Sequence, residues 1–136
     1  MTIPAHTHGR NTPLRLLFAI AFFVALVFAL TMALLPHPPQ VMGNMWDKEQ
    51  HMLAFGTLTL LAAFGFPAVS LPRIAERLSF VGALIEVAQS YPALHRDCDI
   101  FDWIADTVAV IIVALVVGLV VRMLKRGIGA APRHHA

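Results

Sequence analysis

The stretch LRLLFAIAFFVALVFALTMALL, from Leu14 to Leu35, decides the fold of this chain. It contains no acidic or amide side chain, and as a helix it would be about 33 Å long, enough to cross a hydrocarbon core of about 30 Å. Its apolar run is longer than the roughly 7–15 residues of a secretory signal, and no small-residue cleavage site follows before Pro36. The stretch therefore predicts a membrane-spanning first helix that is retained.

The composition favours the same setting for the whole chain. Of 136 residues, 58% are hydrophobic and 13% are charged, and the mean hydropathy is +0.73. A soluble domain carries about 25% charged residues, because its surface must face water. The composition therefore predicts an integral membrane protein.

Three further apolar stretches follow, at 49–69, 74–92 and 102–121. Connections that contain Pro, Gly or charged residues separate them, and such residues are typical of helix ends. Each stretch is long enough to span a membrane with some tilt. We therefore expect an all-α fold, a four-helix membrane bundle at 14–121, between an N-terminal tail at 1–13 and a basic tail at 122–136.

Basic residues predict the orientation of this bundle. In a four-span arrangement one side of the membrane receives most of them, namely Arg10, Arg15, Arg73, Arg77, Arg122, Lys125, Arg126 and Arg133. Only Lys48 and Arg96 fall on the other side. Because cytoplasmic connections carry the excess of Lys and Arg, both termini are expected in the cytoplasm. The net charge of +2 thus indicates topology and not nucleic-acid binding.

Glu86 and Gln89 lie one helical turn apart inside the third stretch. A charged side chain at the centre of a bilayer costs roughly 2.5–3.5 kcal/mol on insertion scales, so such residues usually have a function. We expect the functional site around Glu86.

Polar residues of the neighbouring stretches fall at the same level. Asp47 and His51 share one helical face at the start of the second stretch, with Lys48 beside them. The approach to the fourth stretch and its first turns contribute Arg96, Asp99, Asp102 and Asp106. The outer halves of three helices are therefore predicted to form a convergent polar crevice.

A purely structural interpretation applies to some of these residues. Asp99 and Asp102 would lie near the positive end of the fourth helix dipole and could simply cap it. His51 could either pack or handle protons, since an imidazole titrates near neutral pH. Glu86 and Asp106 lie a turn or more deeper, where water does not screen them unless a cavity admits it, so a functional role is favoured for both.

Three fragments in this order resemble the VanZ-like family of small bacterial membrane proteins. They are Asp47-Lys48-x-x-His51-x-x-x-Phe55, Glu86-x-x-Gln89 and Arg96-x-x-Asp99-x-x-Asp102-x-x-x-Asp106. The similarity covers about 46–118. The resemblance implies a multi-pass protein of the bacterial cytoplasmic membrane. Through the founding member it also implies a link to resistance to teicoplanin, a lipid-bearing glycopeptide, but it implies no particular reaction.

The residue types indicate what such a site could do. Glu86, His51 and Asp106 are the candidates for proton exchange with a substrate hydroxyl or water. The candidates for substrate binding are Asp47, Lys48, Gln89, Arg96, Asp99 and Asp102, and among them the two cations could hold a phosphate. We expect a protein that binds or modifies a lipid head group or lipid-linked envelope intermediate at the outer leaflet, whether or not it is an enzyme.

Three alternatives stay open at this point. An intramembrane acid could couple a carrier or flippase to protons, and four helices would then require a homodimer. Asp99, Asp102 and Asp106 could hold Mg²⁺ or Ca²⁺ through carboxylate oxygens, although the sequence defines no cage for a metal and none is expected. The chain could also be a membrane scaffold, in which the polar residues only hold the helices together.

Overall fold

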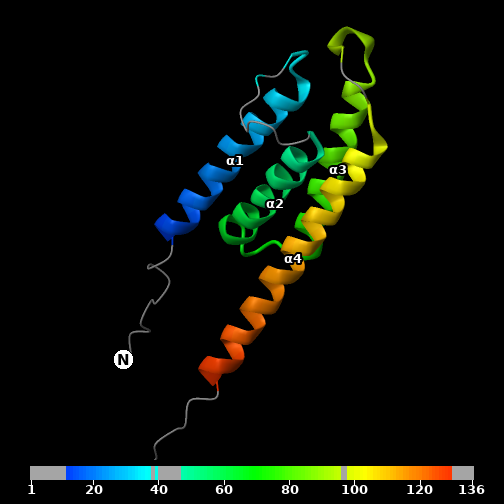
Figure 1. Cartoon of the computed structure of the whole chain (residues 1–136). Helices are drawn as coiled ribbons and strands as arrows, with labels where there is room; N and C mark the ends of the chain where they lie inside the picture. Colours follow the sequence, from blue (N-terminus) through cyan, green and yellow to red (C-terminus); the bar gives the residue numbers. More distant parts are fainter. Residues whose placement is uncertain (1–11, 38, 40–46, 96–97, 130–136) are drawn as a thin grey trace, which may run out of the picture.

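The computed structural model of the chain describes residues 12–37, 39, 47–95 and 98–129, without the side chains at 47, 128 and 129. These residues form four α-helices, one short 3-10 helix and no strand (Figure 1). In chain order the elements are α1 (Thr12–Leu34), α2 (Asp47–Gly65), α3 (Leu71–Gln89), η1 (Pro92–Leu94) and α4 (Ile100–Gly129). The expected all-helical class is confirmed for this part of the chain.

Three helix ends differ from the expected ones, two of them beside a proline and one at a run of charged residues. Helix α2 ends at Gly65 and not at 69, because Pro67 follows and cannot continue a helix. Helix α3 begins at Leu71, with Pro72 in its first turn, where the missing N–H has no partner to lose. Helix α4 continues to Gly129, so 122–129 are helical although we expected them in the tail. Its Arg, Lys, Met and Leu residues are good helix formers, and charge alone does not end a helix.

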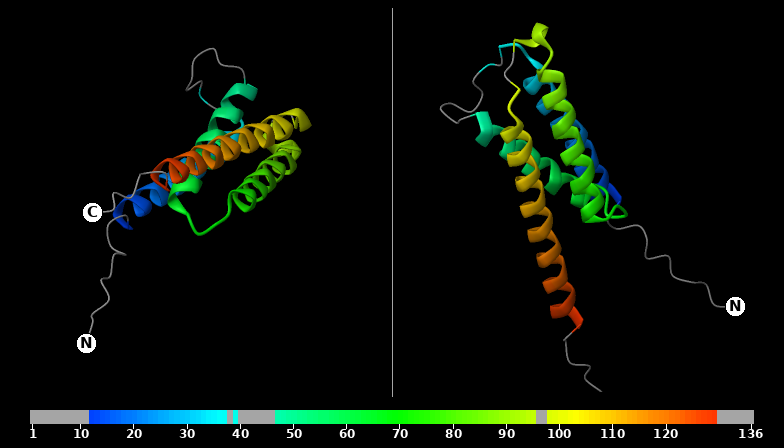
Figure 2. Two further views of the ribbon diagram at one scale, coloured as in Figure 1. Left: turned by 90° about the horizontal axis from the view of Figure 1, so that it is seen from below. Right: turned by 90° about the vertical axis from the view of Figure 1, so that its right-hand side faces the viewer.

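The chain reverses after each helix, so that the four helices have two common ends (Figures 1 and 2). Helix α2 packs against both α1 and α4, while α3 packs mainly against α4. The starts of α2 and α4 lie with the end of α3 at what we call the polar end. The starts of α1 and α3 lie with the ends of α2 and α4 at what we call the basic end.

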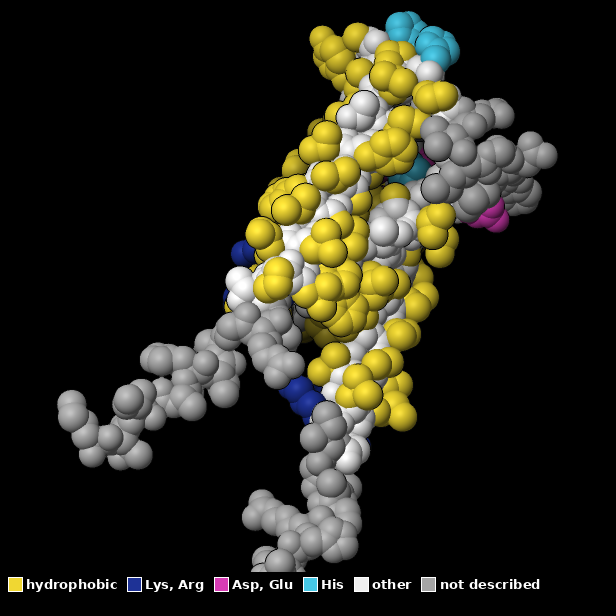
Figure 3. Space-filling model, turned by 90° about the vertical axis from the view of Figure 1, so that its left-hand side faces the viewer, with side chains coloured by type: hydrophobic (Ala, Val, Ile, Leu, Met, Phe, Trp, Pro, Cys, Tyr) yellow, Lys and Arg dark blue, Asp and Glu magenta, His cyan; other side chains and the backbone are white. Residues whose placement is uncertain are grey.

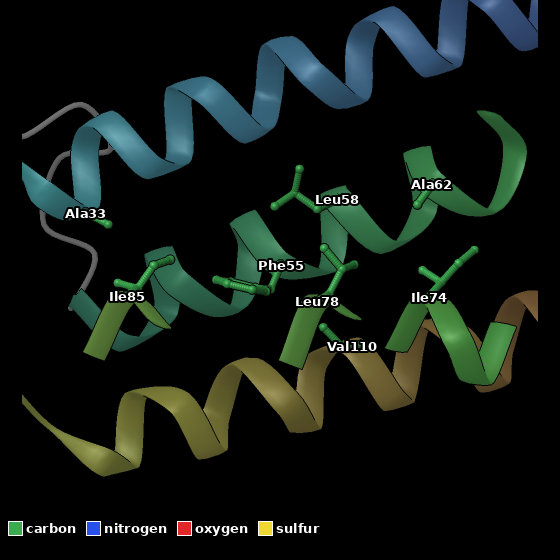
Figure 4. Close-up of a cluster of buried hydrophobic side chains, with 8 residues drawn as sticks. All are labelled: Ala33, Phe55, Leu58, Ala62, Ile74, Leu78, Ile85 and Val110. Atoms are coloured by element: carbon green, nitrogen blue, oxygen red, sulfur yellow. The ribbon is translucent and has the colours of Figure 1, made fainter. Parts of the chain in front are cut away.

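The core lies around α2 (Figure 4). The buried residues of the core come from all four helices. They are Ala33, Phe55, Leu58, Ala62, Ile74, Leu78, Ile85 and Val110. Helix α1 adds aromatic contacts near the basic end, where the Phe22 and Phe66 rings meet edge to face with centroids 5.4 Å apart. Gly65 allows α1 and α2 to cross closely, since a Cβ there would lie 2.9 Å from the backbone N of Ala19.

Two helices of the described chain are long and apolar enough to cross a membrane, α1 and the Ile100–Gly127 part of α4. Only 6% of the apolar window of α1 and 28% of that of α4 is buried inside the structure. Hydrophobic side chains accordingly cover most of the face seen in Figure 3. A soluble monomer rarely exposes so large an apolar surface, so these two helices are compatible with a membrane protein.

Candidate functional site

Six of the nine side chains predicted for the site lie together at the polar end. We call this group the polar cluster, and its members are Lys48 and His51 from α2, Glu86 from α3, Asp99 from the α3–α4 connection, and Asp102 and Asp106 from α4. The side chain of Asp47 and all of Arg96 lie outside the described residues. The i, i+3 and i, i+4 spacings turn these residues to one face of each helix, as the sequence predicted.

At the outer edge of the polar cluster, Lys48 joins α2 to the start of α4. Its Nζ lies 2.9 Å from Asp102 Oδ1 and 3.4 Å from Asp99 Oδ2. The ammonium also lies 5.7 Å from the centroid of the Phe101 ring, within the range of a cation–π contact. Lys48 therefore has its charge balanced by two carboxylates, and a phosphate would have to compete with them.

Deeper in the cluster, His51 meets Asp106. The Nδ1 of His51 lies 3.3 Å from Asp106 Oδ2, and both side chains are buried. The other oxygen, Asp106 Oδ1, is buried without a hydrogen-bond partner in the described part of the chain. A buried polar oxygen without a partner is costly in a native protein, which points to a bound water, a proton or a ligand at this atom.

Space for the Asp106 carboxylate comes from a glycine on the facing helix. A Cβ at Gly82 of α3 would lie 3.6 Å from Asp106 Oδ2, 3.3 Å from Trp103 Cδ1 and 3.6 Å from Phe55 Cζ. Phe55, which is only 2% exposed, thus lies close to the same space as the carboxylate. Gly82 was not predicted as a neighbour of this pair, because a single glycine in a helix carries no distinctive signal.

Glu86 binds the backbone of the α3–α4 connection. Its Oε2 accepts a hydrogen bond from the Asp99 N–H at 3.0 Å, and the residue is 7% exposed. Loss of solvation and the neighbouring Glu86 carboxylate raise the pKa of the Cys98 thiol. Cys98 is thus not primed as a thiolate nucleophile. Glu86 has a structural task at the polar end in addition to any chemical one.

Asp99 caps α4, as the structural interpretation allowed. Its Oδ1 accepts a hydrogen bond from the Phe101 N–H at 2.9 Å, and its carbonyl accepts one from the Asp102 N–H at 2.8 Å. The Phe101 N–H, with the nearby Lys48 ammonium, lowers the pKa of the Asp99 carboxyl. A carboxylate here also faces the positive end of the α4 dipole.

Gln89 does not join the polar cluster. Its Nε2 donates to the Ala33 carbonyl at 2.9 Å, and the residue is 3% exposed. Ala33 lies in the last turn of α1, where backbone carbonyls have no partner within the helix. Gln89 therefore ties α3 to α1, and its predicted role in substrate binding gains no support from its position.

Two further contacts that the sequence analysis missed fix α3 against α4. The hydroxyls of Ser79 and Thr107 lie 2.8 Å apart, and Trp103 Nε1 donates to the Ser79 carbonyl at 3.0 Å. Isolated Ser and Thr residues in apolar helices are common, and only the rotation of each helix about its axis shows which of them meet. These contacts join the two helices that carry Glu86 and Asp106.

The carboxylates of the cluster do not form a metal cage in the described residues, where no group of three His, Cys, Asp or Glu side chains is placed to hold an ion. Asp99 and Asp102 converge on Lys48, and Asp106 faces His51. The Lys48 ammonium thus lies between Asp99 and Asp102, where a metal ion bound by these two carboxylates would lie.

Comparisons of the chain with protein-family models, with curated proteins and with solved structures find no match. The chemistry of the polar cluster and the form of the surrounding helices are therefore the basis for a functional conclusion.

Proposed function

We propose that the chain is a four-span protein of the bacterial cytoplasmic membrane with both termini in the cytoplasm, similar to the VanZ-like family. The apolar, exposed surfaces of α1 and α4 support membrane insertion. The alternating helix directions bring Arg15, Arg73 and Arg122 to the same end, and that end would face the cytoplasm. Helices α2 and α3 would cross beside them with their polar residues turned inward.

The polar cluster would bind or chemically modify a lipid head group or a lipid-linked envelope intermediate in the outer half of the membrane. One observation carries this proposal: Asp106, 1% exposed, has an oxygen without a described partner and faces His51 inside an apolar assembly. The oxygen without a partner costs stability although the other oxygen contacts His51, so a scaffold would gain nothing from this second oxygen.

The roles within the cluster follow from its contacts. His51 and Asp106 are the pair that could take a proton from a substrate hydroxyl, because they are in contact and shielded from water. Glu86 would hold the connection closed over this pair through the Asp99 N–H. Lys48 would orient a substrate only by exchanging one of its carboxylate partners, Asp99 or Asp102, for the ligand.

The test is a comparison of envelope lipids, by mass spectrometry, between cells that lack the protein and cells that express wild type, Asp106→Asn or Glu86→Gln at equal folded levels. We expect a lipid species to be made or consumed with wild type and with neither variant. The matched control is Glu76→Gln, which makes the same change on the exposed face of α3 near the basic end. Identical lipids in all strains would contradict a modifying activity.

The buried His51–Asp106 pair also supports a second candidate, a proton-coupled carrier or flippase. Proteoliposomes with a pH gradient and a fluorescent lipid would then show transport with wild type and none with Asp106→Asn. Cross-linking of the same samples would test the homodimer that four helices would need. If neither lipid chemistry nor transport depends on Asp106, the scaffold remains.

The link to glycopeptides is tested separately, because it derives from family resemblance alone. Expression of wild type in a susceptible host is expected to raise the teicoplanin concentration that inhibits growth, and Asp106→Asn is expected to abolish the increase. An unchanged inhibitory concentration with folded wild type would remove this part of the proposal.

A further inference from the structure

A groove opens at the basic end, on the side of the molecule away from the polar cluster. Its volume is about 610 Å³, within the range of roughly 300–1,000 Å³ typical of ligand sites. Helix α1 forms one wall, α4 forms the other, and the end of α2 with the α2–α3 connection forms the floor.

The packing of the helices makes this groove a fixed feature. Gly65 and Ala19 set the crossing of α1 and α2 beside it, with backbone so close that the crossing cannot shift without strain. On the other wall, the Leu71 side chain fills the space beside Gly118 of α4, where a Cβ would lie 3.3 Å from Leu71 Cδ1. The two walls are therefore held by α2 and by the start of α3.

The lining combines apolar walls with three cations. Phe18, Phe64 and Val117 are among the apolar lining residues, and Arg15, Arg122 and Lys125 also line the groove. No acidic residue lines the groove in the described part of the chain, and no described carboxylate pairs with these three cations. Arg15 comes from the start of α1 and the other two from the last third of α4, so residues distant in sequence place positive charge at one point.

We propose that the groove binds an anionic phospholipid of the leaflet that the basic end meets. The head-group phosphate would be held by Arg15, Arg122 and Lys125, and an acyl chain would lie along the apolar walls. Guanidinium groups bind phosphate oxygens in a bidentate way, and basic pockets between membrane helices are suited to anionic head groups. The inference rests on the proposed membrane placement but not on the chemistry of the polar cluster.

The same end of the molecule provides a matched control. Arg73, Arg77 and Arg126 are exposed at the basic end but do not line the groove. A triple change of these residues to Gln removes as much charge as a triple change of Arg15, Arg122 and Lys125. Any general effect of net charge on lipid attraction or on membrane orientation is therefore common to both variants.

The experiment measures lipid binding to the full chain in detergent by native mass spectrometry. The probes are phosphatidylglycerol and phosphatidylcholine with identical acyl chains. Wild type is expected to prefer phosphatidylglycerol. The groove variant is expected to lose at least about tenfold in its affinity for this lipid, since each basic residue near an anionic lipid contributes about fivefold, while the control variant keeps the preference. Equal losses in both variants would overturn the proposal.

A second variant separates the groove from surface charge. Ala63→Phe adds bulk to the floor without changing any charge, so it is expected to weaken binding of phosphatidylglycerol while circular dichroism shows the same helix content. Unchanged binding would mean that the cations act outside the groove and would overturn the proposal. Displacement of the lipid by glycerol 3-phosphate would likewise overturn it, because it would indicate a site for a free phosphate.

The membrane placement is checked on membranes of the same cells, before detergent is added. Extraction of membranes with alkaline carbonate is expected to leave the protein in the pellet. Release into the supernatant would overturn the membrane placement and the lipid groove together, whereas retention with no lipid preference would overturn only the groove.

Discussion

The two ends of the helices handle charge in opposite ways. At the polar end, Lys48 meets Asp99 and Asp102, and His51 meets Asp106, so polar groups from different elements pair in partly or fully buried positions. At the basic end, Arg15 and Arg122 line an open groove and have no carboxylate partner in the described chain. The same fold thus encloses paired polar groups at one end and presents exposed cations at the other.

The cost of burial explains why the two ends are built differently. A buried carboxylate must be paired or hydrogen-bonded, because the loss of water around it is otherwise not compensated. Asp102 and Glu86 meet this condition through Lys48 and the Asp99 N–H. Exposed cations have no such requirement, so they stay available for an external anion. The least compensated buried group, Asp106 Oδ1, is therefore the most informative atom at the polar end.

The largest effect is expected at the basic end, where Gly65→Val should disrupt the crossing of α1 and α2. A Cβ at this position would lie 2.9 Å from Ala19 N and 3.1 Å from Ala19 Cα, and backbone atoms cannot move aside as a side chain can. We expect a loss of about 3 kcal/mol or more in the free energy of unfolding. Thermal unfolding in detergent micelles, followed by circular dichroism, measures it.

The control for this change is Gly127→Ala, in the exposed last turns of α4. No atom lies within 4 Å of a Cβ there, so the change should stabilise the helix slightly, by about 0.5–1 kcal/mol. Equal effects of the two substitutions would show that the close crossing does not hold α1 in place.

The next largest effect is expected at the polar end, for Asp106→Ala. The change removes the carboxylate that His51 contacts and leaves space beside Gly82, so unfolding should become easier by about 1–3 kcal/mol. Asp106→Asn keeps the shape and a hydrogen-bonding group, and it should cost less. The same thermal unfolding assay ranks the two variants, and an Ala variant as stable as wild type would contradict a packed His51–Asp106 pair.

A smaller effect is expected for Gln89→Leu, which tests the tie between α3 and α1. Leucine has a volume similar to that of glutamine but cannot donate a hydrogen bond to the Ala33 carbonyl. The free energy of unfolding should therefore fall by about 1 kcal/mol. Lipid changes that depend on Asp106 should persist in this variant. Loss of those changes in a stable Gln89→Leu protein would instead return Gln89 to the site, where the sequence analysis placed it.

Sequence patterns predicted the helices well where apolar runs were long. The run after Thr12 and the run before Arg122 appear as α1 and α4, because uninterrupted apolar residues of this length have few other structures. The end of α4 was missed, since the charged residues from Arg122 onward were interpreted as the end of a helix when they mark only a change of environment. Helix α2 ends before the predicted position 69, because Pro67 cannot continue it.

The residues that gather at the polar end could be predicted, but the partner of each one could not. Spacing of three and four residues is enough to place Asp99, Asp102 and Asp106 on one face. The partner of each residue depends on how far every helix is rotated and displaced along its axis, which spacing does not specify. Glu86 and Gln89 illustrate this point, since they are three residues apart and yet bind the α3–α4 connection and α1 respectively.

The smallest effect is expected for Asp99, whose side chain is 45% exposed and so partly screened by water. Asp99→Ser should keep a cap for the Phe101 N–H but lose the carboxylate charge. Because the folded state lowers the pKa of Asp99, its charge stabilises the protein above the unfolded pKa of about 3.9, and this contribution is lost as the pH falls through the folded value.

The difference in stability between wild type and Asp99→Ser should therefore be largest near neutral pH and should vanish in acid. Thermal unfolding of both proteins over a series of pH values measures it, and the other carboxyl groups, which titrate in both proteins, largely cancel in the difference. A difference that widens as the pH falls would mean that Asp99 is destabilised by its neighbours. In that case Lys48 would form a stabilising ion pair only with Asp102. Asp99 would then be, like Asp106, a carboxylate whose charge is not fully balanced by its neighbours.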